Sequence, residues 1–328
     1  MIVITGGAGF IGSNLVAALD ARGDDDIVVC DRLHSGNKWR NLAKHRLADL
    51  IVPDQIDDFL ARHRHQIRAL FHLGAISATT AIDGDAVVET NFRLSMRLWD
   101  WCVTAQVPFI YASSAATYGD GSFGFDDDND PRALRQLRPL NLYGWSKWLF
   151  DLRVRSLAAA GKPTPPHWIG LKFFNVFGPN EYHKGEMKSV IATLTTQIQE
   201  GGRARLFKSH HPDYTDGGQL RDFVWIDDVI DVMLWLYAQP NVNGIFNVGT
   251  GRSRTYYDLA TAVFRALNHD VDIDYVDMPL ALREKYQYFT EARMERLIAA
   301  GYSRPFTLLE DAVTTYVRDN LINADPYR

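Results

Sequence analysis

The chain has 328 residues, of which 46% are hydrophobic and 23% charged, and this balance is typical of a globular protein with one large or two modest domains. The formal net charge of −5 at pH 7 argues against a nucleic-acid partner, because such proteins usually carry a basic face. The only two cysteines, Cys30 and Cys102, exclude a disulfide framework and favour a reducing compartment.

Neither a leader peptide nor a membrane span is indicated by the hydropathy pattern. Met1–Thr5 already has the character of a strand, with no charged leader or cleavage site before it. No run of about 18 apolar residues occurs in the chain. We therefore expect a cytoplasmic protein with no membrane partner.

The first half of the chain alternates short strands with longer helices. Compact runs of β-branched and aromatic residues predict strands at Ile2–Thr5, Ile27–Asp31, Ala69–His72, Phe109–Ser113 and Trp168–Phe173. Apolar residues at spacings of three and four predict helices at Ile11–Arg22, Gln55–His65 and Val87–Gln106, and another helix that begins near Leu142. This alternation is typical of an α/β protein with a doubly wound parallel sheet.

The second half of the chain is less regular. Loops are expected at Asn175–Gly185, where Gly178-Pro179 is a breaker, and at Ser209–Gln219. The remaining expected elements are strands at Arg221–Ile226 and Gly244–Gly249 and helices at Met187–Glu200, Asp227–Ala238, Thr255–Leu267 and Leu308–Leu321. The acidic run Phe125–Asp130 is expected to be a solvated surface loop, not a metal site.

A glycine-rich turn, Gly6-Gly7-Ala8-Gly9-Phe10-Ile11-Gly12, links the first strand to the first helix. Its glycines permit a tight turn, close approach of the backbone to a pyrophosphate, and close helix–strand packing. The helix N-terminus offers unpaired N–H groups and a partial positive charge to phosphates. Asp31 ends the next strand, about 20 residues on, where a carboxylate that binds ribose belongs. The pattern predicts a dinucleotide site on a Rossmann-type sheet, although an ordinary glycine turn would share the triplet alone.

A second motif, Tyr143-Gly144-Trp145-Ser146-Lys147, places Tyr143 and Lys147 four residues apart, on one face of a helix. A free phenol has a pKa near 10 and is a poor base at neutral pH. A neighbouring ammonium and an oxidised nicotinamide would both favour the phenolate. On its own such a pair is usually a coincidence of two surface residues. After a dinucleotide motif, it predicts an acid/base pair.

The segment Tyr111–Gly119 lies at the end of a predicted parallel strand, where ligands bind in open α/β sheets. A serine hydroxyl there could hydrogen-bond the sugar oxygen that exchanges a proton. A polar exit from a strand is the ordinary explanation. With the Tyr/Lys pair present, we favour a functional role for Ser114.

Together these motifs resemble the extended short-chain dehydrogenase/reductase superfamily, in its nucleotide-sugar-modifying branch. The resemblance extends along almost the whole chain through Asn91, Asn175–Pro179, Arg221–Val229 and Gly244–Gly249. It implies that Ser114, Tyr143 and Lys147 form the catalytic triad. It also implies a dinucleotide-binding domain of 1–173 plus about 223–252, and a discontinuous substrate-binding domain of about 174–222 plus 253–328.

Four local strings, His183–Met187, Ser113–Gly119, Pro139–Phe150 and Tyr286–Thr290, resemble the ADP-glyceromanno-heptose 6-epimerase family, which serves the synthesis of the lipopolysaccharide core. The resemblance promotes Lys184, otherwise an ordinary surface lysine, to a second acid/base. It implies a substrate site made of Ser77, Thr79, Ser114, Asn175, Lys184, Phe207, Arg221 and Tyr286, with the forked guanidinium of Arg221 on the diphosphate. It implies a cofactor site made of Gly6, Gly9, Phe10, Ile11, Gly12, Asp31, Arg32, Lys38, Leu73, Gly74, Ala75, Asn91, Tyr143, Lys147 and Val176. No metal site is expected.

The choice between NAD and NADP depends on the residues around Asp31, and the chain differs from the family pattern at three places. Asp31 alone would favour NAD, but Arg32 and Lys38 could neutralise a 2′-phosphate and the family uses NADP. We therefore expect NADP and keep NAD open. Leu73 replaces an acidic residue of the family, Pro53 replaces a lysine, and the loop 208–220 is longer than expected.

The sequence therefore predicts epimerisation at C6 of ADP-D-glycero-D-manno-heptose through transient oxidation by a tightly bound NAD(P). Ala115-Ala116 stands where a 4,6-dehydratase would have its Asp-Glu pair, so elimination lacks its acid and base. A UDP-hexose 4-epimerase remains the enzymatic alternative. An NAD(P)-sensing binding protein would be expected to have lost Tyr143 or Lys147. We also expect a homo-oligomer that binds a nucleotide sugar and no nucleic acid.

Overall fold

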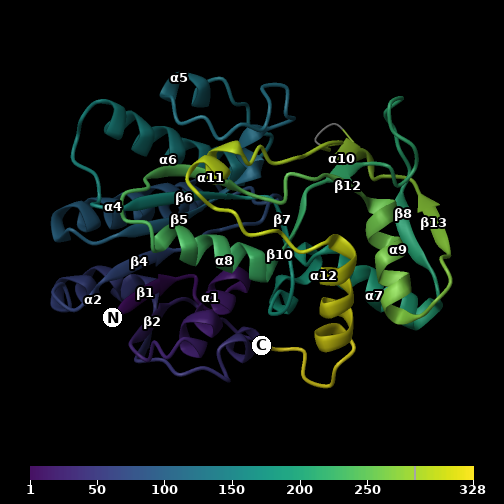
Figure 1. Cartoon of the computed structure of the whole chain (residues 1–328), viewed down its shortest axis with the longest axis horizontal. Helices are drawn as coiled ribbons and strands as arrows, with labels where there is room; N and C mark the ends of the chain where they lie inside the picture. Colours follow the sequence, from purple (N-terminus) through teal and green to yellow (C-terminus); the bar gives the residue numbers. More distant parts are fainter. Residues whose placement is uncertain (284–285) are drawn as a thin grey trace.

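The computed structural model describes residues 1–283 and 286–328, and it is built on a seven-stranded parallel sheet (Figure 1). The strands lie in the order β11-β6-β5-β4-β1-β2-β3, and every neighbouring pair is parallel. Their bounds are β1 (Ile2–Thr5), β2 (Ile27–Cys30), β3 (Asp49–Ile51), β4 (Ala69–His72), β5 (Phe109–Ser114), β6 (Trp168–Phe173) and β11 (Gly244–Val248). The Rossmann-type doubly wound sheet that the sequence predicts is confirmed.

The strand order reverses direction between β1 and β4. From β1 the chain moves outward through β2 to β3, whereas from β4 it moves the other way through β5 to β6. Because parallel crossovers are right-handed, the helices of the two halves cover opposite faces of the sheet. Ligands of open α/β sheets bind at the carboxyl ends of the strands where the order reverses, so the topology places the site between β1 and β4.

Helices cover both faces of this sheet. On one face, α1 (Phe10–Ala21) packs against α8 (Ile226–Tyr237), which precedes β11. On the other, a helical run of α3 (Gly84–Val88), η3 (Glu89–Arg93) and α4 (Leu94–Ala105) packs against α6 (Leu142–Ala159) through η3. Shorter helical segments are η1 (Lys38–Asn41), η2 (Pro53–Gln55), α2 (Ile56–Arg62), η4 (Ala115–Tyr118) and α5 (Pro131–Leu134).

Most of the remaining elements gather beyond the carboxyl end of the sheet, on the right of Figure 1, whereas α11 (Glu295–Ala299) lies against β11. There α9 (Tyr256–Leu267) packs against α7 (Val190–Gly201) and α12 (Leu309–Thr315), which continues into η6 (Tyr316–Leu321). Three two-stranded sheets complete this part: β7 (Asn175–Phe177) with β10 (Phe223–Trp225), β9 (Leu220–Arg221) with β12 (Arg254–Thr255), and β8 (Ala204–Phe207) with β13 (Ile273–Val276). The other segments are η5 (Tyr182–Met187) and α10 (Leu280–Arg283).

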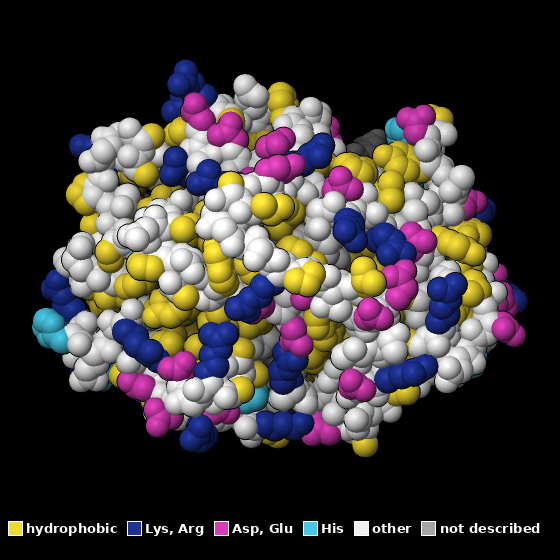
Figure 2. All heavy atoms as spheres, in the orientation of Figure 1, with side chains coloured by type: hydrophobic (Ala, Val, Ile, Leu, Met, Phe, Trp, Pro, Cys, Tyr) yellow, Lys and Arg dark blue, Asp and Glu magenta, His cyan; other side chains and the backbone are white. Residues whose placement is uncertain are grey.

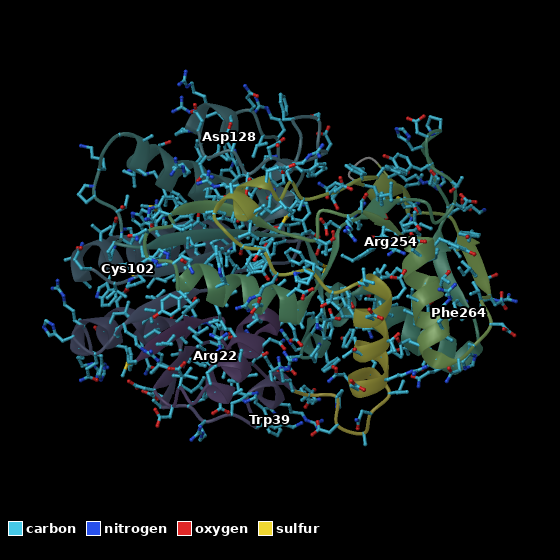
Figure 3. The ribbon with its side chains drawn as sticks, viewed as in Figure 1. Arg22, Trp39, Cys102, Asp128, Arg254 and Phe264 are labelled. Atoms are coloured by element: carbon cyan, nitrogen blue, oxygen red, sulfur yellow. The ribbon has the colours of Figure 1, made fainter. Side chains whose placement is uncertain are left out.

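The core lies between the sheet and its helices. All residues of β1, β2, β4 and β6 are buried, as expected for parallel strands covered on both faces. Trp99 of α4 packs edge-on against Phe109, Phe150 and Trp168, and so joins α4 to β5, α6 and β6. Both cysteines are buried and free, with Cys102 inside α4 (Figure 3). Neither therefore takes part in a disulfide framework.

Three predictions from the sequence are corrected by the structure. The segment Asn175–Gly185, expected to be a loop, contains β7 and the start of η5, and α7 begins at Val190 after the Ser189 cap instead of at Met187. The acidic run Phe125–Asp130 is only partly solvated, because it covers the edge strand β11. Asn129 bonds the backbone N–H and carbonyl of Ile245, and Asp127 accepts from the Asn247 N–H at 2.8 Å. An edge strand needs such partners for its free backbone groups.

The described residues include no helix that is both long and apolar enough to cross a membrane, and no cluster of three or more histidine, cysteine or acidic side chains with metal-binding geometry. Acidic and basic side chains are interspersed over the face shown in Figure 2. That face therefore has no extended field of one sign, in keeping with the modest net charge.

Candidate active site

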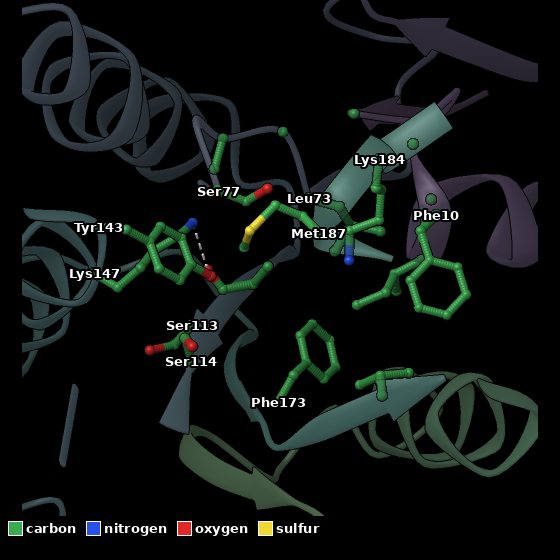
Figure 4. Close-up of a pocket in the computed structure, with 18 of the residues that line it drawn as sticks. Phe10, Leu73, Ser77, Ser113, Ser114, Tyr143, Lys147, Phe173, Lys184 and Met187 are labelled. Carbon is green, nitrogen blue, oxygen red and sulfur yellow. Dashed lines mark hydrogen bonds between the residues drawn. The ribbon is translucent and has the colours of Figure 1, made fainter. Parts of the chain in front are cut away.

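A cavity of about 340 Å³ opens at the carboxyl ends of β1, β4, β5 and β6, at the reversal of strand order (Figure 4). Most of the residues that the sequence singles out line it. They are Gly6, Gly9, Phe10, Ile11, Gly12, Asp31, Lys38, Leu73, Gly74, Ala75, Ser77, Ser114, Tyr143, Lys147, Val176 and Lys184. Among the titratable side chains in its wall are three lysines and one carboxylate, a balance that suits an anionic ligand.

The turn between β1 and α1 has the geometry of a phosphate cradle. Gly6 has φ +70°, and a Cβ at this position would stand 2.5 Å from the backbone nitrogen of Gly74, so only glycine allows the loops after β1 and β4 to meet. Gly9 is the N-cap of α1 and has no side chain to occupy the first N–H groups of the helix. These groups and the helix dipole therefore face the cavity, and they fit a pyrophosphate.

Asp31 anchors the other end of this cleft. Its carboxylate accepts hydrogen bonds from the backbone N–H groups of Ala8 and Arg32 at 2.9 and 2.7 Å, and from Lys38 Nζ at 2.6 Å. Arg32 turns away to pair with Asp54 at 2.8 Å. All four charged side chains line a second cavity of about 480 Å³, which adjoins the first at Asp31, Lys38, Gly74 and Ala75. The continuous cleft fits an extended dinucleotide.

Tyr143 enters the first cavity from α6, one residue into the helix. The helix begins after Asn141, whose side chain caps it by accepting from the Gly144 N–H at 2.8 Å. A Cβ on Gly144 would meet the carbonyl oxygen of Ala116 at 2.6 Å, so the glycine lets α6 lie directly against the segment after Ser114. Burial raises the pKa of the Tyr143 phenol, and a hydrogen bond with Ser114 opposes this shift. Ser114 therefore stands beside the phenol.

Lys147 lies one helical turn after Tyr143 and is almost fully buried. Its ammonium donates a hydrogen bond to the carbonyl oxygen of Ala112 in β5 at 2.8 Å, drawn in Figure 4. Burial lowers the pKa of Lys147 to about 8, against an opposing effect of the Asp151 carboxylate. The ammonium is thus charged at neutral pH but close to its titration range.

Lys184 reaches the same cavity from η5, on the side opposite Tyr143 and Lys147 (Figure 4). Its Nζ lies 5.3 Å from the centre of the Phe10 ring, and burial lowers its pKa while the Glu181 carboxylate raises it. Glu181 also fixes η5 to its neighbours by accepting hydrogen bonds from the Ser189 N–H at 2.6 Å and the Tyr316 hydroxyl at 2.8 Å. Two titratable side chains, Tyr143 and Lys184, therefore stand on opposite walls.

A third cavity, of about 260 Å³, continues from Lys184 away from the sheet. Its wall includes Asn175 and the aromatic rings of Phe223 and Tyr256. Arg221 lies just behind it, with its guanidinium 5.7 Å from the Tyr256 ring and 5.0 Å from the Tyr286 ring. A cation that lies against two aromatic rings is suited to binding a nucleotide.

Some of the expected residues lie away from these cavities. Asn91 is buried and bonds the backbone of Ile76 and the Ser146 hydroxyl, so it ties the loop after β4 to α6. Thr79 is exposed, and Phe207 ends β8, outside the three cavity walls.

Sequence reasoning did not select six residues of the first wall, Ala112, Ser113, Phe173, Phe174, His183 and Met187. His183 and Met187 flank Lys184 in the string that carries the resemblance, and this neighbourhood could have identified them.

The sequence matches the model of the NAD dependent epimerase/dehydratase family over residues 2–249. It is 51% identical over 335 aligned residues, covering all of both chains, to the ADP-L-glycero-D-manno-heptose-6-epimerase of Nitratidesulfovibrio vulgaris strain DP4.

Two solved structures share the fold. The ADP-L-glycero-D-manno-heptose-6-epimerase of Helicobacter pylori is 27% identical with a TM-score of 0.77, covering 97% of this chain and 95% of its own. The UDP-N-acetylglucosamine 4-epimerase of Methanobrevibacter ruminantium has a TM-score of 0.79 at 24% identity, covering 97% and 96%. Fold similarity alone therefore does not separate the two activities, whereas the full-length sequence identity favours the first.

Proposed function

The chain belongs to the NAD-dependent epimerase/dehydratase family, and from this premise we propose that it is an epimerase that inverts C6 of ADP-D-glycero-D-manno-heptose. The reaction is a transient oxidation and reduction with no net redox change. In this proposal the cofactor lies along the cleft between Gly6 and Asp31, and the nucleotide sugar enters from the cavity beside Asn175. We assign residues 1–173 plus about 223–252 to the cofactor and the remainder to the substrate.

One observation carries the proposal: Tyr143 and Lys184 project into one cavity from opposite walls. An epimerase that inverts one carbon must handle the proton of its hydroxyl in two orientations. A single base on one wall serves one orientation only. An acid/base catalyst must lie within hydrogen-bond distance of the proton that it transfers. Two groups on opposite walls can meet this requirement for both orientations of the hydroxyl.

In the proposed mechanism, Tyr143 accepts the proton of the C6 hydroxyl while Ser114 holds the same oxygen. A bound nicotinamide supplies hydride acceptance and return, and its positive charge in the oxidised form counters the burial that raises the phenol pKa. The 6-keto sugar then turns its C6–C7 arm about the neighbouring bond. Lys184, whose pKa is lowered by burial, returns a proton to the oxygen in its new orientation.

We further propose that the cofactor is NADP, with NAD as the alternative outcome. The Asp31 carboxylate, which would repel a 2′-phosphate, is already paired with Lys38 at 2.6 Å. Arg32 lines the same cavity, and its ion pair with the solvent-exposed Asp54 contributes little free energy. Arg32 can therefore exchange the Asp54 carboxylate for the 2′-phosphate at a low electrostatic cost. Both features support acceptance of the 2′-phosphate.

The test is to incubate the purified protein with ADP-D-glycero-D-manno-heptose and, separately, with UDP-glucose, and to follow the composition of epimers by NMR. We expect an equilibrium mixture of the heptose epimers and an unchanged hexose. Epimerisation of UDP-glucose with unchanged ADP-heptose would overturn the substrate assignment and indicate a 4-epimerase. No turnover of either sugar, with bound NAD(P), would favour a binding protein.

A further inference from the structure

A fully buried ion pair lies directly behind the catalytic residues. Asp151 of α6 and Lys172 of β6 have no exposed side-chain surface, and Asp151 Oδ2 is 2.9 Å from Lys172 Nζ. Neither residue lines a cavity that contains Tyr143. Burying two charges is costly, and an apolar pair of similar volume is often as stable. The pair therefore calls for an explanation other than stability.

The two charges hold both ends of the segment that carries Ser114. The Ser113 hydroxyl donates to Asp151 Oδ2 at 2.6 Å, and Lys172 Nζ donates to Thr117 Oγ1 at 2.5 Å. Thr117 in turn donates to the carbonyl oxygen of Ser114 at 2.8 Å. Ser114 thus lies between two residues that are fixed by the same ion pair.

The same carboxylate also joins α6 to the strand that positions Lys147. Asp151 Oδ1 accepts a hydrogen bond from the Tyr111 hydroxyl at 2.9 Å. Between Tyr111 and Ser113 lies Ala112, whose carbonyl oxygen accepts from Lys147. Asp151 follows Lys147 by four residues and Tyr143 by eight, so all three share one face of the helix. Its charge acts on both, since it raises the pKa of Lys147 and of Tyr143.

We propose that Asp151 and Lys172 are positioning residues that fix the Ser113–Thr117 segment against α6, and that the Asp151 carboxylate is the negative charge on the helix face that carries Tyr143 and Lys147. This inference rests on the proposed function, because it assigns roles behind the proposed catalytic residues. Lys172 offsets part of the Asp151 charge, because the two groups are paired at 2.9 Å.

Apart from the proposed catalytic residues, the titratable groups nearest to Asp151 and Lys172 are neutral, so these two residues supply the charge behind the site. Burial lowers the pKa of His72 in β4 to about 3, so this histidine is neutral. Burial raises the pKa of Tyr111 and of Tyr118, on β5 and η4, well above the usual range, so both are neutral.

Three more distant groups face the same network, one of them from α6 itself and two from other parts of the chain. Asp127, in the segment over β11, is affected by Lys172, and burial raises its pKa to about 6. Arg155 lies one helical turn beyond Asp151 and acts on Tyr111. Across the cavity stands Lys184. These three are unchanged in the variants below, so their contribution cancels.

The test compares Asp151→Asn with the wild type in the cofactor-loaded protein. Loss of the carboxylate lowers the pKa of both Lys147 and Tyr143. The acidic and the alkaline limb of the pH profile of kcat should therefore both move to lower pH. The expected displacement is about one pH unit, because the charges lie one to two helical turns apart. Ionisation of Tyr143, followed by ultraviolet difference absorbance against the same protein carrying Tyr143→Phe, must show the same shift without substrate. If kcat falls while both limbs and the phenol titration stay in place, Asp151 is only structural and the proposal is overturned.

Two further variants and a control complete the design. Lys172→Met removes the cation alone and should move both limbs of the pH profile of kcat to higher pH. If Asp151→Asn does not fold, this shift in the opposite direction tests the same proposal. The double variant Asp151→Asn/Lys172→Met should return the limbs to near the wild-type values, with kcat still reduced by the freer Ser114 segment. Asp228→Asn, which removes a helix carboxylate bonded to Thr307 remote from the cavity, should lower stability without moving either limb.

The phenol titration does not depend on the sugar. If the wild type leaves ADP-heptose unchanged but the titration shifts as expected, the proposed function fails and the positioning role stands.

Discussion

Replacement of Lys147 by methionine should abolish turnover and yet stabilise the fold at neutral pH. Burial lowers the pKa of this lysine from its usual 10.5 to about 8, so the folded protein holds the proton less tightly than the unfolded chain. At pH 7 both states are protonated, and the 2.5-unit difference corresponds to a cost of about 3 kcal/mol in the free energy of unfolding. Lys147→Met removes this cost but loses the hydrogen bond to Ala112, worth about 1 kcal/mol.

The sign of the pH dependence follows from proton counting. Between pH 8 and 10.5 the unfolded chain binds more protons, so the wild-type stability rises with pH and the cost falls to about 1.5 kcal/mol at pH 9.5. The variant should therefore be about 2 kcal/mol more stable than the wild type at pH 7 and nearly equal to it at pH 9.5.

Urea unfolding at both pH values, with both proteins free of cofactor, measures this difference, because Lys147 belongs to the proposed cofactor site and bound cofactor would stabilise the two proteins to different extents. A variant that is less stable than the wild type by the same amount at both pH values would refute the reasoning.

Three other predictions concern the site. Tyr143→Phe should fold and bind cofactor normally and lose about 10²–10⁴-fold in turnover, and a variant that keeps a tenth of wild-type turnover would show that the phenol is not the base. Lys184→Met should cut epimerisation far more than Lys162→Met, an exposed control; equal rates in steady-state assays would remove Lys184 from the mechanism. Mass spectrometry of the nucleotide released on denaturation should find NADP, and Arg32→Ala should weaken NADP more than NAD in titration calorimetry; NAD alone would contradict the cofactor assignment.

The sequence was most informative where local chemistry and periodicity agree. The strands β1, β4 and β6 lie at the predicted residues, because short runs of β-branched and aromatic side chains between glycine-rich turns have few alternatives. Gly6, Asp31, Tyr143 and Lys147 were found because each belongs to a motif with fixed spacing.

The elements that were missed lack such periodicity. β3 is a short edge strand with two exposed residues, and β8 and β13 pair with each other although 65 residues separate them in the chain. Contacts of this kind leave no local pattern in a single sequence. The same holds for the Asp151–Lys172 pair, whose partners lie on different elements, and for Asp127, whose acidic neighbours suggested a solvated loop.

Isotope retention distinguishes transient oxidation at C6, by a cofactor that stays bound, from inversion by any other route. ADP-D-glycero-D-manno-heptose with deuterium at C6 is converted in ordinary water, and the product is analysed by NMR and mass spectrometry. We expect an epimer that keeps its deuterium at C6, because the hydride that leaves the sugar returns to the same carbon. Loss of the deuterium to solvent at the rate of epimerisation would contradict the account, because it would show inversion by proton exchange at carbon.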